Sequence, residues 1–147
     1  MVVNLLNNSS VPMPKSYLRR AVQCVFKELT KVHLNKNFKN SEMSLIFLDP
    51  PAAKKLNKQY RHKNYATDVL SFPAQQPFLG ELIMCPQVLK LQAQEQKHSF
   101  RQETLYMVIH GILHLLGYEH EKDVKQANIM FALQEELFIK TLHKLNK

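Results

Sequence analysis

Hydrophobic and polar positions follow two different periodicities along the first half of the chain. The apolar segment 2–6 and the run MSLIFL at 43–48 are too short for ordinary helices and end in polar or proline-rich residues, which predicts a strand at each. Between them, apolar residues recur every three or four positions over 18–29, as in an amphipathic helix. A further helix is expected after the paired prolines that follow Asp49, its predicted N-cap.

The second half begins with two strand-like segments and continues as helix alone. TDVLSFP at 67–73 is rich in β-branched and aromatic residues, and the apolar positions of LGELIMCP at 79–86 can be assigned to the two faces of a strand. We expect the two segments to be neighbouring strands. A break is expected at Gly117. The helical periodicity falls into three pieces, at about 86–98, 101–116 and 123–144. This order predicts an α+β fold in which a small, mostly mixed sheet packs with about five helices.

Length and composition favour one folded domain. With 147 residues, 45% of them hydrophobic and 22% charged, the chain is close to the globular average, which excludes disordered and collagen-like classes. We therefore expect residues 1–147 to form a single domain. The sequence has neither a long apolar run nor a signal-like amino end, so we expect no membrane partner and a cytoplasmic location. Cys24 and Cys85 are flanked by apolar residues and are expected to be packed thiols in a reducing compartment.

The charge balance favours a polyanionic partner. Twenty Lys and Arg residues against twelve Asp and Glu give a net charge of +8, which attracts RNA, DNA or acidic lipid. The alternative is a basic surface that serves solubility alone. Lys54, Lys58 and Arg61 stand at i, i+4 and i+7 of the helix expected after Asp49, which gathers three cations on one of its faces.

Three of the seven histidines lie in the segment HGILHLLGYEH at 110–120. His110 and His114 are one helical turn apart, and Gly117 permits the turn that would bring His120 beside them. Three imidazoles on Zn²⁺ leave one coordination position open, which is typical of a catalytic site, so we predict one zinc ion per chain. The alternative is a set of surface or capping histidines without metal. The remaining histidines are expected to be solvated: His33, His62, His98 and His143.

The same histidine spacing occurs in metzincin peptidases, where the position after the first histidine is the glutamate that acts as general base. Here that position is Gly111, which cannot accept a proton. A zinc metallopeptidase-like hydrolase would therefore need a carboxylate from another segment, such as Glu81, Glu119 or Glu121. This makes the peptidase the weaker alternative.

Several motifs in one consistent order resemble the YbeY family of metal-dependent endoribonucleases. They lie between about residues 42 and 138 and read LNKQYRHKNYATDVLSFP, LGELIM, HGILHLLGYEH and ANIMFALQEELF. The resemblance implies an α+β fold, a zinc-like ion on the three histidines and cleavage of single-stranded RNA. It also implies a part in ribosomal RNA maturation and ribosome quality control, with ribosomal RNA and the small ribosomal subunit as partners.

The resemblance also assigns site residues. It places the metal ligands on the three histidines of HGILHLLGYEH and the cleft arginine on Arg61, whose planar fork of donors fits two phosphate oxygens. Asp68 and Ser71 border the same cleft, where we expect them to orient a water or a histidine, or else to cap the neighbouring turn. The chain departs from the family's usual Asp and Pro at Asn64 and Ala66. It also has Glu81 in place of the usual Asp.

Cations and aromatic residues near Arg61 are candidates for holding RNA. Lys54 and Lys58 are expected to bind its backbone, with Lys55 and Lys63 adding to the field, unless this is only a solvated face. Stacking on bases by nearby aromatic residues is a weaker expectation than packing in the core. The residues interpreted as core are Tyr60, Tyr65, Phe72, Phe78, Met130, Phe131, Leu137, Phe138 and Leu142.

Two questions stay open at the level of sequence. The attacking nucleophile is either a metal-bound water or the ribose 2′-hydroxyl, and both fit the residues present. A non-catalytic RNA- or ribosome-binding module with a structural metal is the alternative from a different functional class. That module would bind RNA without cutting it, whereas an enzyme would lose turnover when its open metal position is blocked.

Overall fold

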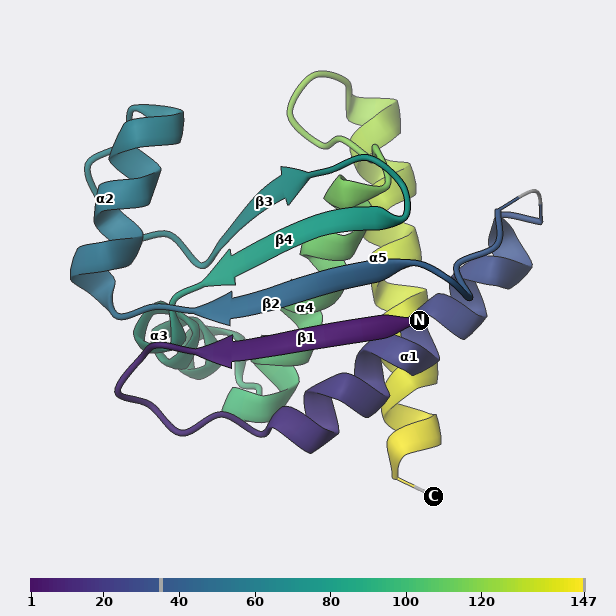
Figure 1. Ribbon diagram of the computed structural model, residues 1–147, viewed down its shortest axis with the longest axis horizontal. Helices are drawn as coiled ribbons and strands as arrows, with labels where there is room; N and C mark the ends of the chain where they lie inside the picture. Colours follow the sequence, from purple (N-terminus) through teal and green to yellow (C-terminus); the bar gives the residue numbers. More distant parts are fainter. Residues whose placement is uncertain (35, 147) are drawn as a thin grey trace.

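Within residues 1–34 and 36–146, which the computed structural model describes, the chain forms four strands and five helices (Figure 1). In chain order they are β1 (Val2–Asn7), α1 (Lys15–Val32), β2 (Glu42–Phe47), α2 (Pro50–Arg61), β3 (Val69–Pro73), β4 (Phe78–Met84), α3 (Pro86–Gln96), α4 (Phe100–Leu115) and α5 (Val124–Leu145). The predicted α+β class is confirmed. Within the described ranges, none of these helices has the length and apolarity needed to cross a membrane.

The four strands form one mixed sheet in the order β1-β2-β4-β3. β1, β2 and β4 are parallel, and β3 is antiparallel to β4. The pairing of β3 with β4 confirms that these two segments are neighbouring strands. Gly80 allows the close approach of these two strands, because its φ is +139° and a Cβ there would lie 2.2 Å from the carbonyl oxygen of Phe72. β3 is an edge strand, so one of its sides is not paired within the sheet.

Helix α4 lies in the centre of the helical layer, between the sheet and α5 (Figure 1). It begins with a capping box in which the Ser99 hydroxyl accepts from the backbone N–H of Gln102 and the Gln102 side chain accepts from that of Ser99. Gly111 brings the helix close to β4, since a Cβ at this position would lie 2.8 Å from both methyl carbons of Leu82. Packing on several sides therefore fixes the position of α4 and of the side chains that it carries.

The chain reverses direction after α4, at the break predicted from Gly117. This glycine has a φ of +98°, and its backbone N–H donates to the carbonyl of His114. The N–H of Tyr118 donates to the carbonyl of Leu113, which completes the helix end. Residues 118–123 then lead to α5, where the Asp123 side chain accepts from the N–H of Lys125.

Helix α2 lies beside one end of the sheet and buries little of its surface (Figure 1). Ala53 and Asn57 are buried, but Tyr60 is 57% exposed, so the aromatic residue near the end of this helix does not pack in the core. The Asn57 side-chain amide donates to the carbonyl of Tyr65 at 2.8 Å, which attaches the segment after α2 to the helix. α2 is thus a helix with a largely solvated surface.

Asp49 is the N-cap residue of α2, as predicted, but its side chain makes no capping hydrogen bond. Its carboxylate instead accepts from the backbone N–H of Ser10 at 2.9 Å and from the side-chain amide of Gln87 at 2.7 Å. The hydrogen bond from Ser10 is the first cause that lowers the pKa of Asp49. This carboxylate therefore joins the loops after β1 and β2 to the start of α3.

The interpretation of the aromatic residues as core is wrong at four positions. Tyr60, Tyr65, Phe78 and Phe131 are each more than two-fifths exposed. The first three lie on α2, in the segment after it and at the start of β4, where no element covers them. Phe72 is only partly buried, and it meets Tyr60 edge to face with 5.2 Å between ring centroids. On α5 the prediction is confirmed for the buried residues Met130, Leu137 and Phe138, and Leu142 is partly buried.

Two of the histidines expected to be solvated are partly buried and have partners. His98 lies 2.9 Å from the carboxylate of Glu103, which is itself buried in α4. His33 lies 2.8 Å from the hydroxyl of Tyr118, because the end of α1 meets the loop that follows α4. His62 and His143 are exposed, as expected. Both cysteines are free, Cys85 fully buried and Cys24 partly.

Candidate metal centre and its cleft

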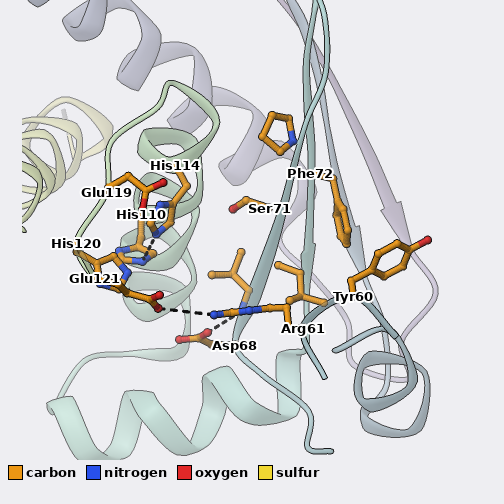
Figure 2. A pocket seen from close by; sticks show the side chains of 13 residues that line it. Tyr60, Arg61, Asp68, Ser71, Phe72, His110, His114, Glu119, His120 and Glu121 are labelled. Carbon is orange, nitrogen blue, oxygen red and sulfur yellow. Dashed lines mark hydrogen bonds and ion pairs between the residues drawn. The ribbon is translucent and has the colours of Figure 1, made fainter. Parts of the chain in front are cut away.

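The three histidines of HGILHLLGYEH converge on one point (Figure 2). His110 and His114 come from the last turns of α4, and His120 comes from the loop that follows it. One ligand nitrogen from each ring lies within 4.8 Å of the others, and all three residues are partly buried. The helical spacing and the turn at Gly117 therefore bring together the residues that the sequence singles out.

The hydrogen bonds behind two of these rings favour metal binding. The Nδ1 of His114 lies 3.0 Å from the carbonyl oxygen of Tyr118, and a carbonyl can only accept, so this Nδ1 carries the proton. The Nδ1 of His110 is likewise engaged, by the side-chain oxygen of Gln134 at 3.1 Å. The Nε2 atoms of His110 and His114 then lie 3.1 Å apart, with their lone pairs facing each other.

Two facing lone pairs repel each other unless a proton or a cation lies between them. Nitrogens bound to one tetrahedral zinc at about 2.0–2.1 Å stand about 3.3 Å apart, close to the observed separation. Imidazole is also a ligand that zinc and neighbouring transition metals prefer. The donor set thus fits a metal ion of this class.

Burial keeps two of the rings in the neutral form that a metal requires. Loss of solvation lowers the pKa of His110 and of His114 below the usual value, and the other rings of the cluster lower it further. Hydrogen bonds to Gln134 and to Tyr118 act in the opposite direction but do not reverse the shift. Both ligands therefore stay deprotonated to a lower pH than a free histidine.

A cleft of about 600 Å³ opens in front of the histidines. It has a histidine wall, made of His110, His114 and His120, and a helix wall, made of Tyr60 and Arg61 at the end of α2 (Figure 2). The edge strand β3 runs between the two walls. The remaining residues that line the cleft are Asp68, Glu119 and Glu121. The cleft thus places a candidate metal opposite a cationic helix end.

Arg61 spans the opening of the cleft. One guanidinium nitrogen lies 3.7 Å from a carboxylate oxygen of Glu121, and both side chains are well exposed. Such an exposed pair is weak, so a phosphate can displace Glu121 from the guanidinium at little cost. Lys54 and Lys58 are exposed on α2 but do not line the cleft.

Asp68 and Ser71 both lie at the cleft, at the start and in the middle of the β3 region. One carboxylate oxygen of Asp68 accepts from the N–H of Val69 at 2.7 Å, and the other accepts from Gln92 at 3.0 Å. These bonds match the turn-capping alternative for Asp68. Ser71 points from β3 toward the histidine wall (Figure 2).

Two residues of α5 belong to this site although the sequence reasoning did not place them there. Gln134 contacts His110 as described above and is almost completely buried. The Phe131 ring lies beside two ligands, with centroids 6.3 Å from His110 and 5.5 Å from His120. A glutamine at helical spacing between the apolar residues Met130 and Leu137 is the signal that could have identified Gln134.

The geometry also accounts for the glycine at the position of the metzincin base. Gly111 faces Leu82 of the sheet, and a Cβ there would lie 2.8 Å from both of its methyl carbons, so a glutamate at this position would require Leu82 to move. Of the remote carboxylates considered, Glu81 is exposed and does not line the cleft, whereas Glu119 and Glu121 do. The helix thus carries no general base at the metzincin position, and the close contact with Leu82 disfavours one there.

Comparisons with known proteins agree with the motifs. The profile of the family described as Endoribonuclease YbeY matches residues 4–142. A protein named Endoribonuclease YbeY from Bdellovibrio bacteriovorus is 43% identical over 99% of both chains. The one from Renibacterium salmoninarum is 39% identical over 93% of this chain and 90% of its own. The solution structure of TM1509 from Thermotoga maritima is 28% identical, with a TM-score of 0.67, over 99% of this chain and 92% of that one.

Proposed function

The chain belongs to the YbeY endoribonuclease family, and from this premise we propose that it cleaves single-stranded RNA with a metal ion held by His110, His114 and His120. The observation that carries this proposal is the convergence of three imidazoles on one wall of a cleft whose other wall ends in an arginine. Endoribonuclease is the activity that the names of the relatives state.

Zinc, one ion per chain, is the metal that we propose. Three neutral imidazoles suit it, and the cleft leaves room for a further ligand in front of them. When bound, the ion supplies Lewis acidity to a phosphate oxygen or lowers the pKa of a water. The protein's own contribution is to hold the three rings in place and, through burial, to favour the uncharged form of His110 and His114.

Arg61 is proposed to clamp the scissile phosphate from the helix wall. Its guanidinium is a cation whose planar donors match two phosphate oxygens. The Glu121 carboxylate occupies part of this position, and RNA would exchange its own phosphate for it. Ser71 and Asp68 are proposed to border the bound RNA from the β3 side.

The surface of α2 is proposed to guide RNA toward the cleft. Segment 50–67 has five Lys and Arg residues and no Asp or Glu, so its field is uniformly positive. Lys54 and Lys58 lie on the exposed surface of this helix, within reach of an RNA strand that leaves the cleft past Arg61. We propose ribosomal RNA, in the context of the small ribosomal subunit, as the natural substrate, in processing and quality control in the cytoplasm.

The test is cleavage of an end-labelled single-stranded RNA by the purified protein with one equivalent of Zn²⁺. A His114→Ala variant prepared identically controls for contaminating ribonucleases. Cleavage by the wild type alone, lost on chelation and restored by metal, is the expected result. Equal cleavage by both proteins assigns the activity to a contaminant, and binding of RNA without cleavage favours the non-catalytic module.

A further inference from the structure

Gln134 connects helix α5 to the candidate metal centre through two hydrogen bonds. It is 1% exposed. Its side-chain oxygen lies 3.1 Å from the Nδ1 of His110, and its side-chain nitrogen donates to the backbone carbonyl of Tyr106 at 3.2 Å. A buried side-chain amide that uses both of its ends in this way has a fixed orientation.

The orientation of this amide decides which nitrogen of His110 carries a proton. The carbonyl of Tyr106 can only accept, so the NH₂ end of Gln134 must face it. The opposite orientation would place two acceptor oxygens against each other at that position. The oxygen end of Gln134 therefore faces His110, and the Nδ1 of that ring must donate to it.

We propose that Gln134 is a positioning residue that holds His110 in the tautomer whose Nε2 binds the metal. The proposal rests on the metal centre described above and assigns a role to a residue outside the three ligands. His114 needs no such side chain, because the backbone carbonyl of Tyr118 serves it in the same way. α5 thus provides the hydrogen-bond acceptor for one ring from a side chain, whereas the loop after α4 provides the acceptor for the other ring from its backbone.

Gln134 is also suited to this position because it is uncharged. A hydrogen-bond partner orients a metal-binding imidazole whether it is a carboxylate or a neutral acceptor. A neutral partner leaves the full charge of a divalent ion available to the phosphate of an RNA strand. With the carboxylates of Glu119 and Glu121 already at the cleft, a neutral Gln134 adds no further negative charge behind the metal.

The experiment measures the affinity of the metal-free protein for Zn²⁺ by competition with a chromogenic chelator. Gln134→Met keeps the length of the side chain but removes both hydrogen bonds, and we expect affinity to fall about 10- to 100-fold. Gln134→Glu keeps an acceptor for the Nδ1 proton but loses the donor to the Tyr106 carbonyl, so it should restore part of the affinity. Leu137→Ala is the matched control, because it removes core packing from the same helix and leaves both hydrogen bonds of Gln134 in place.

Each result separates the proposal from simpler explanations. Equal affinity of Gln134→Met and wild type would overturn the role of Gln134 while leaving the metal centre intact. An equal loss in Leu137→Ala would show that the effect comes from general loosening of α5 and would also overturn it. Failure of the wild type to bind Zn²⁺ would remove the metal centre itself, and this proposal with it.

A second measurement does not depend on the variants being folded. The ¹⁵N chemical shifts of the His110 ring in the metal-free wild type distinguish the two neutral tautomers. We expect the proton on Nδ1, and a predominance of the Nε2-protonated form would overturn the proposal.

Discussion

The two walls of the cleft are built in opposite ways. On the histidine wall, α4 is packed against the sheet and against α5, and the two ligands that it carries are each held from behind, by Gln134 and by the backbone of Tyr118. On the helix wall, Arg61 has a side chain that is 40% exposed, and its ion pair is with the solvated carboxylate of Glu121.

This difference indicates a division of labour. Metal binding requires ligands placed before the ion arrives, and fixed hydrogen bonds provide that placement. Recognition of a flexible RNA strand requires charges that can adjust to it, and an exposed helix end provides such adjustment. Changes on the histidine wall should therefore affect metal content and stability, whereas changes on the helix wall should affect catalysis and RNA binding alone.

The largest effect is expected from His114→Ala, which removes one of the three ligands. The protein should lose stoichiometric zinc and cleave RNA no faster than background. The melting temperature measured in the presence of Zn²⁺ should fall toward that of the metal-free wild type, because a bound ion stabilises the folded state. Metal analysis after dialysis and thermal unfolding measure both effects. Retention of one zinc per chain would contradict the assigned ligand set.

Arg61→Ala should show most clearly that the two walls have different roles. We expect cleavage to fall about 10²- to 10³-fold, as for loss of one preorganised donor in other active sites, with zinc content and melting temperature unchanged. Glu121→Gln is the matched control, because it breaks the same ion pair and leaves the arginine free. Single-turnover kinetics at saturating RNA measure the effect. If Glu121→Gln lost as much activity as Arg61→Ala, the ion pair itself, and not the phosphate clamp, would be required.

Changing the pH should affect the histidine wall of the metal-free protein. Burial lowers the pKa of His110 and His114 in the folded state below the unfolded value of about 6.5, so the unfolded chain binds protons first as the pH falls. The free energy of unfolding should therefore be highest above about pH 6.5 and should decrease as the pH falls toward the lowered pKa values. Urea unfolding across this range measures the slope. The same slope in a His110→Gln His114→Gln double variant would contradict the assignment.

The contrast between the walls also explains what could be predicted from the sequence. The ligands were predictable because i and i+4 spacing on a helix and a glycine after it determine where His110, His114 and His120 lie. The strand and helix segments were predictable from local periodicity. Gln134 was not assigned to the site, because it lies 24 positions from His110 in sequence and on a different helix. Local spacing does not show that the two residues are in contact.

The errors share one physical cause. Apolar character predicts burial only where another element is available to cover the residue. Tyr60 lines the cleft at the end of α2, and Phe131 lies on α5 beside the rings of His110 and His120, and nothing in the local pattern reveals either position. Likewise His33 acquires a partner only because the loop after α4 returns to the end of α1. Such long-range arrangements follow from the packing of the whole chain and not from the spacing of neighbouring residues.

The smallest effect is expected from the outer surface of the helix wall, in a Lys54→Ala Lys58→Ala double variant. Both lysines are exposed and lie outside the cleft, so they can contribute only through the charge of the RNA backbone. Each one that contacts a phosphate should add about 0.7 to the slope of log affinity against log salt for a single strand. We therefore expect a few-fold weaker binding at low salt, a shallower slope and an unchanged cleavage rate at saturating RNA.

Lys27→Ala, on α1 beside a different hollow, is the control for net charge alone. Fluorescence anisotropy with a labelled RNA at several salt concentrations measures the slope for each protein. If removing Lys27 weakened binding as much per charge as removing Lys54 and Lys58, the whole basic surface would attract RNA and α2 would have no special part. A slope unchanged in the double variant would make this face of α2 a solvated surface, and the helix wall would then act through its cleft end at Arg61.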